Sequence, residues 1–273
     1  MAAVDGSPYT SVVAWHAAEL ARIVGAQVLA AYVLDERLVC GPLARMLADE
    51  LDVGDQGQLA ETFTAVLQRH GQEGLAAVEA ICAQEGVRVS TTVEHGRPAE
   101  ILAEMAPLYD LAVVGSLGWG AQFGASPLGT TAAELLRLAM RPVMLVREQY
   151  RRVRHALVGY DGSPEAARAL LCVLGMAKPG GWRVTVVTAS PSKARVEALR
   201  TQMQRLEGTE AVPHEVVLRR GAPDHVLIEL AAELGADLVV VGSRGTGKRG
   251  RGTLGSTAEA LCRHAGAPVL ICR

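Results

Sequence analysis

The sequence is written twice, and this internal repeat limits the fold more than any other feature. Five short motifs of the first half return in the same order in the second half. The pairs are Val4–Pro8 with Tyr160–Pro164, Gly96–Pro98 with Gly221–Pro223, Asp110–Gly118 with Asp237–Gly245, Leu128–Glu134 with Leu254–Ala260, and Arg141–Val146 with Ala267–Cys272. Such a repeat predicts two copies of one module, each within the usual range of domain length. We place the boundary so that the modules cover residues 1–149 and 150–273.

The two copies differ in length at one place. The spacing between equivalent residues is 156 for Asp5 and Asp161 but 125 for Gly96 and Gly221, so the first copy carries about 31 extra residues before its Gly96 loop. The extra segment, residues 37–80, is rich in Leu and Ala, which favour helix. We therefore expect a helical insertion in which Gly41, Gly54, Gly57 and Gly71 separate shorter helical segments.

Strands and helices are predicted to alternate in each copy. In the second copy, apolar strands are expected at 156–158, 184–187, 214–218, 238–241 and 268–272, with helices between them. Ser163-Pro164-Glu165 is typical of a helix start, with a capping hydroxyl and proline at the first helical position. This order predicts the α/β class: two Rossmann-like modules, each with a five-stranded parallel sheet between layers of helices. The last strands, 143–146 and 269–272, are apolar enough to need a partner, either each other or a second chain in a homodimer.

Charge and composition exclude several classes of function. The net charge of -2 gives no basic field for nucleic acid. No apolar run reaches the roughly 18–20 residues that span a bilayer, so we expect no membrane segment. The five cysteines form no CxxC pair, and no Cys/His group has metal-ligand spacing, so a reducing, cytoplasmic setting and no protein-held metal are predicted.

Glycines follow the fourth strand of each copy. In the second copy the loop runs from Gly242 to Thr257 and contains Gly245, Gly255 and four basic residues, Arg244, Lys248, Arg249 and Arg251. Glycines allow close approach of a ligand to the backbone, and the free amides at the start of the following helix attract anions. The loop therefore predicts a phosphate site at the carboxyl edge of the sheet.

Three glycine motifs compete for this loop. A Walker A loop would need Ser or Thr at Arg249, and a dinucleotide fingerprint would need an acidic residue about 20 positions after the GxGxxG at Gly245–Gly250. The third pattern is Gly-x2-Gly-x9-Gly-[Ser/Thr], which Gly242, Gly245, Gly255 and Ser256 match without a gap. With the Asp-Gly-Ser and Gly-x-Pro motifs, this pattern resembles the ATP-binding signature of the universal stress protein family, over nearly the whole chain and twice.

The resemblance implies a fold like that of the adenine nucleotide alpha hydrolases and a nucleotide site in each copy. In ATP-binding members, the aspartate after the first strand and an apolar residue after the second hold adenine and ribose, and the glycine loop holds the phosphates. For the second copy the implied residues are Tyr160, Asp161, Ala189, Val241, Gly242, Arg244, Gly245, Gly255, Ser256 and Thr257. For the first copy they are Val4, Asp5, Val33, Gly115, Leu117, Gly118, Gly129, Thr130 and Thr131.

The first copy departs from the pattern. Ten residues rather than nine separate Gly118 from Gly129, and the stretch between them contains no Lys or Arg. The extra residue either bulges out or moves the helix start away from the phosphates. Trp119 in this loop either stacks on a ligand or packs against the protein. We expect His155 and His264 to be surface or cap residues, and Asp5 and Asp161 have an alternative role as turn formers.

The expected function is ATP binding, with Mg²⁺ carried through the phosphates, by a cytoplasmic sensor or regulator of the stress response. No residue is predicted to be catalytic, although slow ATP hydrolysis is compatible with the site. A scaffold that binds no nucleotide is one alternative. A nucleotidyl or phosphoryl transferase is another, but the sequence lacks HxGH-like and SGG-like signatures.

Overall fold

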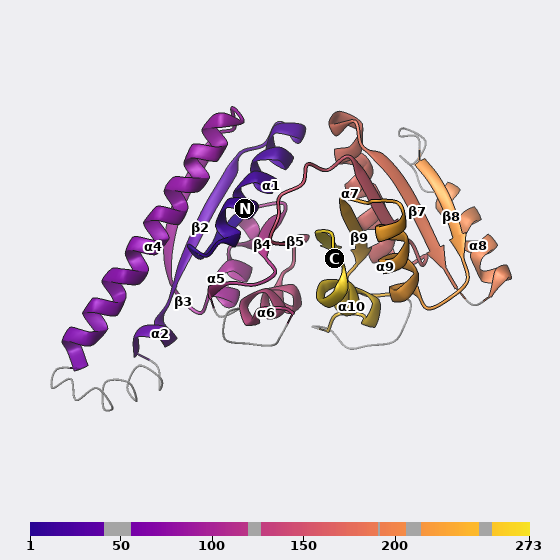
Figure 1. The fold of residues 1–273 in the computed structure, drawn as a ribbon. Helices are drawn as coiled ribbons and strands as arrows, with labels where there is room; N and C mark the ends of the chain where they lie inside the picture. Colours follow the sequence, from indigo (N-terminus) through magenta and orange to yellow (C-terminus); the bar gives the residue numbers. More distant parts are fainter. Residues whose placement is uncertain (41–55, 120–126, 191, 206–213, 246–252) are drawn as a thin grey trace.

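Strands and helices alternate along the chain in the computed structural model (Figure 1), which describes residues 1–40, 56–119, 127–190, 192–205, 214–245 and 253–273. The first copy contains β1 (Ala2–Val4), α1 (Tyr9–Val24), β2 (Val28–Asp35), α2 (Glu36–Cys40), α4 (Gln56–Gln84), β3 (Val89–Gly96), α5 (Pro98–Glu104), a 3-10 turn (Ala106–Leu108), β4 (Ala112–Gly115), α6 (Thr130–Leu138) and β5 (Val143–Val146). The second contains β6 (His155–Gly159), α7 (Pro164–Gly180), β7 (Arg183–Ala189), α8 (Lys193–Gln204), β8 (His214–Arg219), α9 (Pro223–Glu233), β9 (Leu238–Gly242), α10 (Ser256–His264) and β10 (Val269–Cys272). The predicted α/β class is confirmed.

The strands of both copies join in one ten-stranded sheet with the order β3-β2-β1-β4-β5-β10-β9-β6-β7-β8. The pairs within each copy are parallel, and β5 pairs with β10 antiparallel, with Met144 opposite Leu270. The apolar last strands therefore pair with each other, which was one of the two arrangements expected from the sequence. Because β5 and β10 run in opposite directions, the carboxyl ends of the strands, where α/β sheets bind ligands, point to opposite edges of the sheet at the junction of the two copies.

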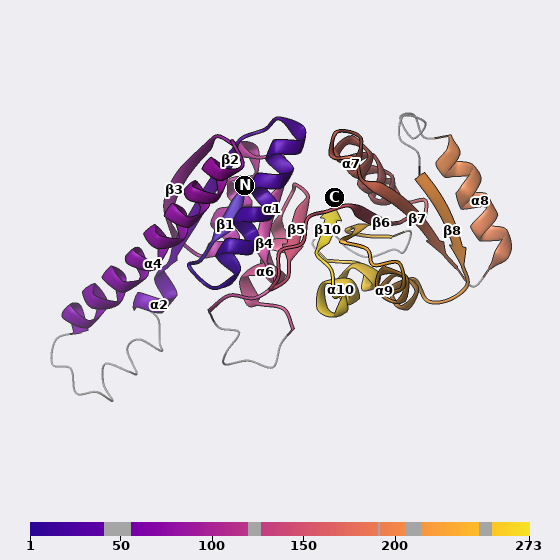
Figure 2. The same ribbon diagram turned by 45° about the horizontal axis from the view of Figure 1, so that its top comes forward.

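Two apolar cores lie on the two faces of this sheet, and each core extends across both copies. Helices α1, α4, α7 and α8 cover one face, and α5, α6, α9 and α10 cover the other. Figure 2 shows α1 and α7 facing each other across the junction, where they are in contact. Met144 and Leu270 belong to the first core, and their neighbours Leu145 and Val269 belong to the second. The alternation of side chains along β5 and β10 thus ties both cores across the junction.

Two arginines join the copies in a reciprocal way. Arg147, directly after β5, donates to the carbonyls of Leu261 and Cys262 at the end of α10, at 3.2 and 2.9 Å. Arg273, directly after β10, donates to the carbonyl of Arg137 at the end of α6, at 2.8 Å. Each cation donates to carbonyls in the last turn of a helix, where the Leu261 carbonyl also accepts the amide of Ala265, and each complements the negative end of the helix dipole.

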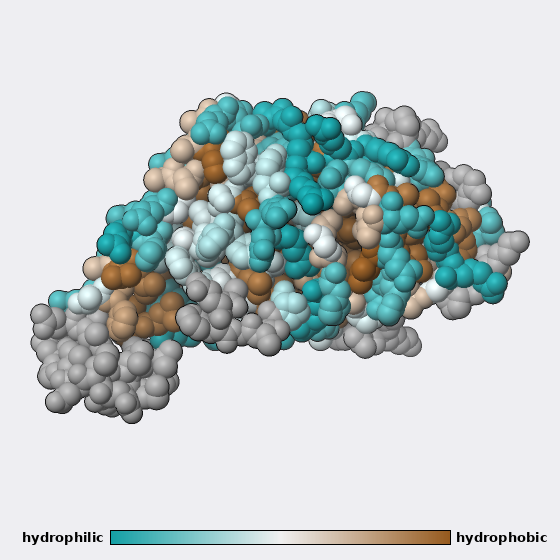
Figure 3. All heavy atoms as spheres, in the orientation of Figure 1, coloured by the Kyte–Doolittle hydropathy of each residue, from teal (hydrophilic) through white to brown (hydrophobic). Residues whose placement is uncertain are grey.

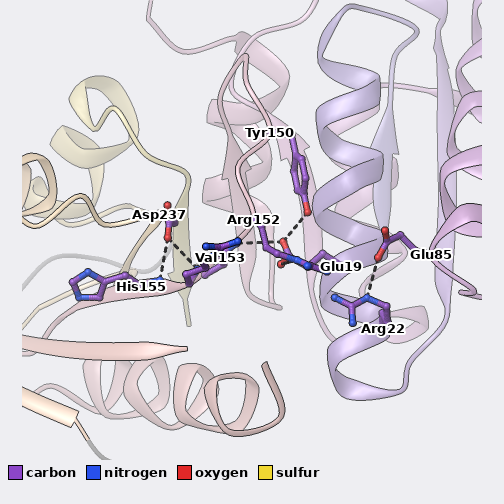
Figure 4. Close-up of polar contacts among 9 residues, drawn as sticks. Glu19, Arg22, Glu85, Tyr150, Arg152, Val153, His155 and Asp237 are labelled. Atoms are coloured by element: carbon purple, nitrogen blue, oxygen red, sulfur yellow. Dashed lines mark hydrogen bonds and ion pairs between the residues drawn. The ribbon is translucent and has the colours of Figure 1, made fainter. Parts of the chain in front are cut away.

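The segment between the copies is held by a buried carboxylate on α1 (Figure 4). Glu19 accepts hydrogen bonds from the Tyr150 hydroxyl at 3.2 Å and from the Val153 amide at 3.4 Å, and it forms an ion pair with Arg152 at 3.4 Å. Burial raises the pKa of Glu19, because the charged form is deprived of water. The hydrogen bonds and the ion pair act against this shift and fix the path of the linker.

The insertion differs from the expectation. Helix α4 is continuous over 29 residues, whereas its counterpart α8 has 12, and Gly57 and Gly71 lie within α4 rather than between segments. Gly41 and Gly54 lie outside the described residues. A Cβ at Gly71 would lie 2.4 Å from the ring of Tyr32, so this glycine lets α4 pack closely on β2. None of the helices in the described part of the chain combines the length and apolarity needed to cross a bilayer.

The expected surface position of His155 is wrong. His155 begins β6 and is buried, and its Nε2 lies 2.9 Å from Oγ1 of Thr185 on β7. Because β6 lies between β7 and β9, neighbouring strands and helices enclose its side chains whatever their polarity. His264, at the end of α10, is exposed as expected.

Candidate functional site

A pocket of about 380 Å³ opens at the carboxyl ends of the strands of the second copy. It is bounded by the ends of β6, β7 and β9 and by the first turn of α10. All of the residues predicted for this copy line it: Tyr160, Asp161, Ala189, Val241, Gly242, Arg244, Gly245, Gly255, Ser256 and Thr257. Five lining residues were missed: Gly159, Ala166, Val187, Pro223 and Ala258. Pro223 was within reach of the sequence, since it ends the Gly-x-Pro motif.

The aspartate of this pocket both forms a turn and faces the glycine loop. Oδ1 of Asp161 accepts the amide of Ser163 at 3.0 Å, across Gly162, which has a φ of 83°. A Cβ at Gly245 would lie 2.5 Å from the other oxygen, Oδ2. The turn-forming role and a place in the pocket are therefore compatible, and the short approach explains why the loop needs glycine there.

Backbone contacts fix the start of α10 against the end of β9. The amide of Gly255 donates to the carbonyl of Ser243 at 2.8 Å, and the amide of Ser243 donates to the backbone carbonyl of Cys272 at 2.6 Å. No described side chain caps α10 at Gly255. The first amides of a helix have no partner within the helix and carry the positive end of its dipole. This end of the pocket is therefore suited to an anion.

Cationic groups lie beside the pocket. Nη2 of Arg244 is 3.8 Å from the Glu165 carboxylate, and the Arg244 side chain is half-buried in the pocket wall. Arg195 on α8 donates to the carbonyl of Asp161 at 3.2 Å. Lys248, Arg249 and Arg251 lie outside the described residues.

The first copy has a pocket of about 360 Å³ at the equivalent place. All of the residues predicted for it line this pocket: Val4, Asp5, Val33, Gly115, Leu117, Gly118, Gly129, Thr130 and Thr131. Oδ1 of Asp5 accepts the Ser7 amide at 2.9 Å, and a Cβ at Gly118 would lie 2.4 Å from Oδ2 of Asp5. The Asp-Gly-Ser turn thus has the same geometry in both copies.

The extra loop residue of the first copy does not move the helix start. Gly129 donates to the carbonyl of Ser116 at 2.8 Å, and its dihedral angles (φ -67°, ψ 152°) match those of Gly255 (φ -68°, ψ 153°). Helix α6 therefore begins at the same place relative to β4 as α10 does relative to β9. Residues 120–126 of this loop are outside the described residues.

The side chains around the first pocket differ from those of the second. Leu117 stands where the second copy has Arg244. Leu38 of α2, Leu67 of α4, Tyr32 of β2 and Trp119 add an apolar wall that the second pocket lacks. Sequence reasoning named only Trp119 of these: Leu38 and Leu67 lie in the insertion, which has no equivalent in the other copy, and Tyr32 was missed on β2. Trp119 packs against the protein, with its Nε1 donating to the carbonyl of Asp5 at 2.8 Å.

Within the described residues, no group of three or more His, Cys, Asp or Glu side chains is placed to hold a metal ion. The four cysteines whose side chains are described, Cys82, Cys172, Cys262 and Cys272, are free thiols.

Comparison with known proteins decides the family. The model of the universal stress protein family matches residues 1–147 and again residues 152–273. The chain belongs to the universal stress protein family. Universal stress protein Rv1996 of Mycobacterium tuberculosis is 31% identical over 246 residues, which are 79% of this chain and 76% of the relative. A universal stress protein of Thermus aquaticus is 34% identical over 132 residues, which cover 43% of this chain and 96% of that protein.

A solved structure confirms the arrangement of the whole chain. The crystal structure of a universal stress protein from Archaeoglobus fulgidus aligns with a TM-score of 0.74, over 95% of this chain and 92% of that chain, at 21% identity. At this identity the likeness establishes the fold shared by the two chains. The ligands of the two pockets have to be argued from their own side chains.

Proposed function

We propose that this universal stress protein binds ATP in the pocket of its second copy and acts as a cytoplasmic sensor or regulator of the stress response. The observation that carries the proposal is the uncapped start of α10, held beside two glycines and Arg244. Backbone amides and a helix dipole meet at this end of the pocket, and Arg244, whose guanidinium lies 3.8 Å from Glu165, adds a positive charge to the pocket wall. This combination favours a phosphate chain over an uncharged group.

The other end of the pocket suits a nucleoside. Val187, Ala189 and Val241 offer apolar surface for a base, and Asp161 offers a carboxylate to ribose hydroxyls. The phosphates would lie along Gly242–Gly245 and against the first turn of α10. Mg²⁺ would be held by the phosphates and water, since the described residues supply no carboxylate cluster.

Calorimetric titration of the full chain with ATP tests the proposal, with Gly255→Asp as the deciding variant. A Cβ at Gly255 meets backbone no closer than 3.4 Å, and aspartate is a favoured helix cap, so the variant should fold. Its carboxylate would occupy the α10 amides and repel phosphates, so we expect at least a hundredfold loss of ATP affinity.

Gly129→Asp is the matched control, since it makes the same change at the start of α6. Under the proposal it leaves ATP binding in the second copy unchanged. ATP binding that is equally strong in wild type and Gly255→Asp would refute the site assignment. A folded wild type that binds no ATP would favour the scaffold alternative. Phosphate release from bound ATP, measured on the same samples, distinguishes slow hydrolysis from binding alone.

A further inference from the structure

We propose that the pocket of the first copy is a separate binding site for an uncharged, mainly apolar small molecule. This inference goes beyond the proposed function, which concerns the second pocket, and it assigns the two copies ligands of different chemistry. It rests on three observations about the first pocket: its apolar wall, the hydrogen bonds within the protein that occupy the polar groups of this wall, and the charge of the lining residues.

Two residues of the apolar wall come from the insertion, which only the first copy has. Leu38 on α2 and Leu67 on α4 belong to the insertion, and Trp119 follows the glycine turn. Leu38 is 54% exposed and Trp119 is 43% exposed, although both line a pocket. Figure 3 shows hydrophobic residues gathered on the surface at α2, beside α4. Apolar side chains left open to water at the mouth of a pocket gain most from an apolar ligand.

The polar tips of the aromatic residues already have partners in the protein. The Tyr32 hydroxyl donates to the carbonyl of Leu67 at 2.8 Å, and Nε1 of Trp119 donates to the carbonyl of Asp5 at 2.8 Å. The ring of His70 on α4 meets the Trp119 ring edge to face, with centroids 5.2 Å apart. These contacts hold both aromatic residues in place and leave their apolar ring surfaces, rather than hydrogen-bonding groups, for a ligand. The wall is therefore formed before any ligand arrives.

The charges around this pocket disfavour an anion. Among the described lining residues none is Lys, Arg or His, and Leu117 replaces the arginine of the second copy. Asp35 is bound by Arg37, with contacts of 2.9 and 2.6 Å, so Arg37 is engaged. Asp5 lies as Asp161 does in the second pocket, so the difference in charge between the two pockets is the cation that the first pocket lacks. A triphosphate would meet carboxylates without a compensating side-chain cation, which raises the cost of placing its charge there.

Size and charge together define the ligand class. A cavity of about 360 Å³ is within the range of small-molecule sites, which are mostly apolar with a few polar groups. An uncharged molecule of two or three fused rings matches this volume and the aromatic wall. The amides at the start of α6 and the Asp5 carboxylate could orient one neutral polar group on it.

Binding of 1-aminoanthracene, an uncharged three-ring fluorophore, to the full chain tests the inference. We expect one probe per chain, with energy transfer from tryptophan that is weaker in Trp119→Phe, in which Trp15 and Trp182 remain as donors. Leu38→Glu places a charge in the exposed mouth and should weaken binding at least tenfold. Leu171→Glu is the matched control, because Leu171 is a similarly exposed leucine (41%) on α7 of the second copy. This control should bind the probe as wild type does.

Competition with ATP separates this inference from the proposed function. Saturating ATP should not displace the probe, and Gly255→Asp should bind the probe normally. Displacement by ATP, or two ATP molecules per wild-type chain and one in Gly129→Asp, would overturn the inference. Equal probe affinity in Leu38→Glu, Leu171→Glu and wild type would also overturn it. Probe binding in a protein that binds no ATP would leave it standing while refuting the proposed function.

Discussion

Lowering the pH from 7.5 to 5.0 should destabilise the folded chain through His16 on α1. This residue is fully buried, and neither ring nitrogen has a hydrogen-bond partner among the described residues. The ring meets Tyr150 edge to face at 4.9 Å. Because burial removes water from the charged form, it lowers the pKa of His16 from 6.5 to about 4.

The size of the effect follows from this shift. The unfolded chain takes up a proton on His16 as the pH falls below 6.5, whereas the folded chain does so only near pH 4. Stability from this group is therefore complete above pH 6.5 and is lost progressively down to pH 4. At about 1.4 kcal/mol per pH unit, the loss at pH 5.0 is about 2 kcal/mol. Burial raises the pKa of Glu19, one turn away, so that carboxyl contributes with the opposite sign.

Urea unfolding of wild type and His16→Leu at the two pH values isolates the histidine, since Glu19 is present in both proteins. The free energy of unfolding should fall by about 2 kcal/mol more in wild type than in His16→Leu. His264→Leu, which changes an exposed histidine on α10, serves as the control and should follow wild type. Equal pH dependence of wild type and His16→Leu would refute the argument, because it would mean that His16 accepts its proton in the folded chain.

Two substitutions test the packing of α4 and the junction. Gly71→Ala should lower the free energy of unfolding in urea despite the higher helix propensity of alanine, because its Cβ would lie 2.4 Å from the Tyr32 ring. Gly175→Ala in α7 has no atom within 4 Å of the added Cβ, so it should raise the free energy of unfolding by up to about 1 kcal/mol. Opposite signs are required; equal effects would contradict the packing. Arg147→Ala should lower the free energy of unfolding by about 2–3 kcal/mol, because it removes two charged hydrogen bonds to α10. Calorimetric unfolding measures this loss, with Arg151→Ala, at an exposed position of the linker, as the control. Equal stability of Arg147→Ala and Arg151→Ala would show that the hydrogen bonds of Arg147 to α10 do not stabilise the junction.

The order of elements was predictable because the signals are local. The side chain of Ser163 accepts from the amide of Ala166 at 3.1 Å, and Pro164 begins α7, as the capping pattern indicates. The need of β5 and β10 for a partner was predictable from their apolar sequences, whereas the sequence left open whether that partner is the other copy or a second chain. The continuity of α4 was not predictable, since the reason for Gly71 is a ring on a strand distant in sequence.

The residues of the candidate sites likewise fall into those that were predictable from the sequence and those that were not. The residues on strand ends and glycine turns were predictable, because the resemblance to the family implied them and the repeat places them at equivalent positions in both copies. Leu38 and Leu67 were not, because the insertion that carries them has no counterpart for comparison. The burial of His155 likewise depends on the position of β6 within the sheet rather than on its neighbours in sequence.

The duplication separates what the backbone determines from what side chains determine. Both copies keep the glycine turn and the helix start with nearly identical dihedral angles, because these features follow from the close contact of strand end, aspartate and helix. Charge has no such constraint, so one copy has Arg244 and the other Leu117 at the same point of the loop. The two loops are separate segments of the chain, so a substitution that changes the charge of one leaves the sequence and the glycine turn of the other as they are. Family membership therefore accounts for the shape of both pockets, and our two proposals assign their ligands from the side chains beside each glycine loop.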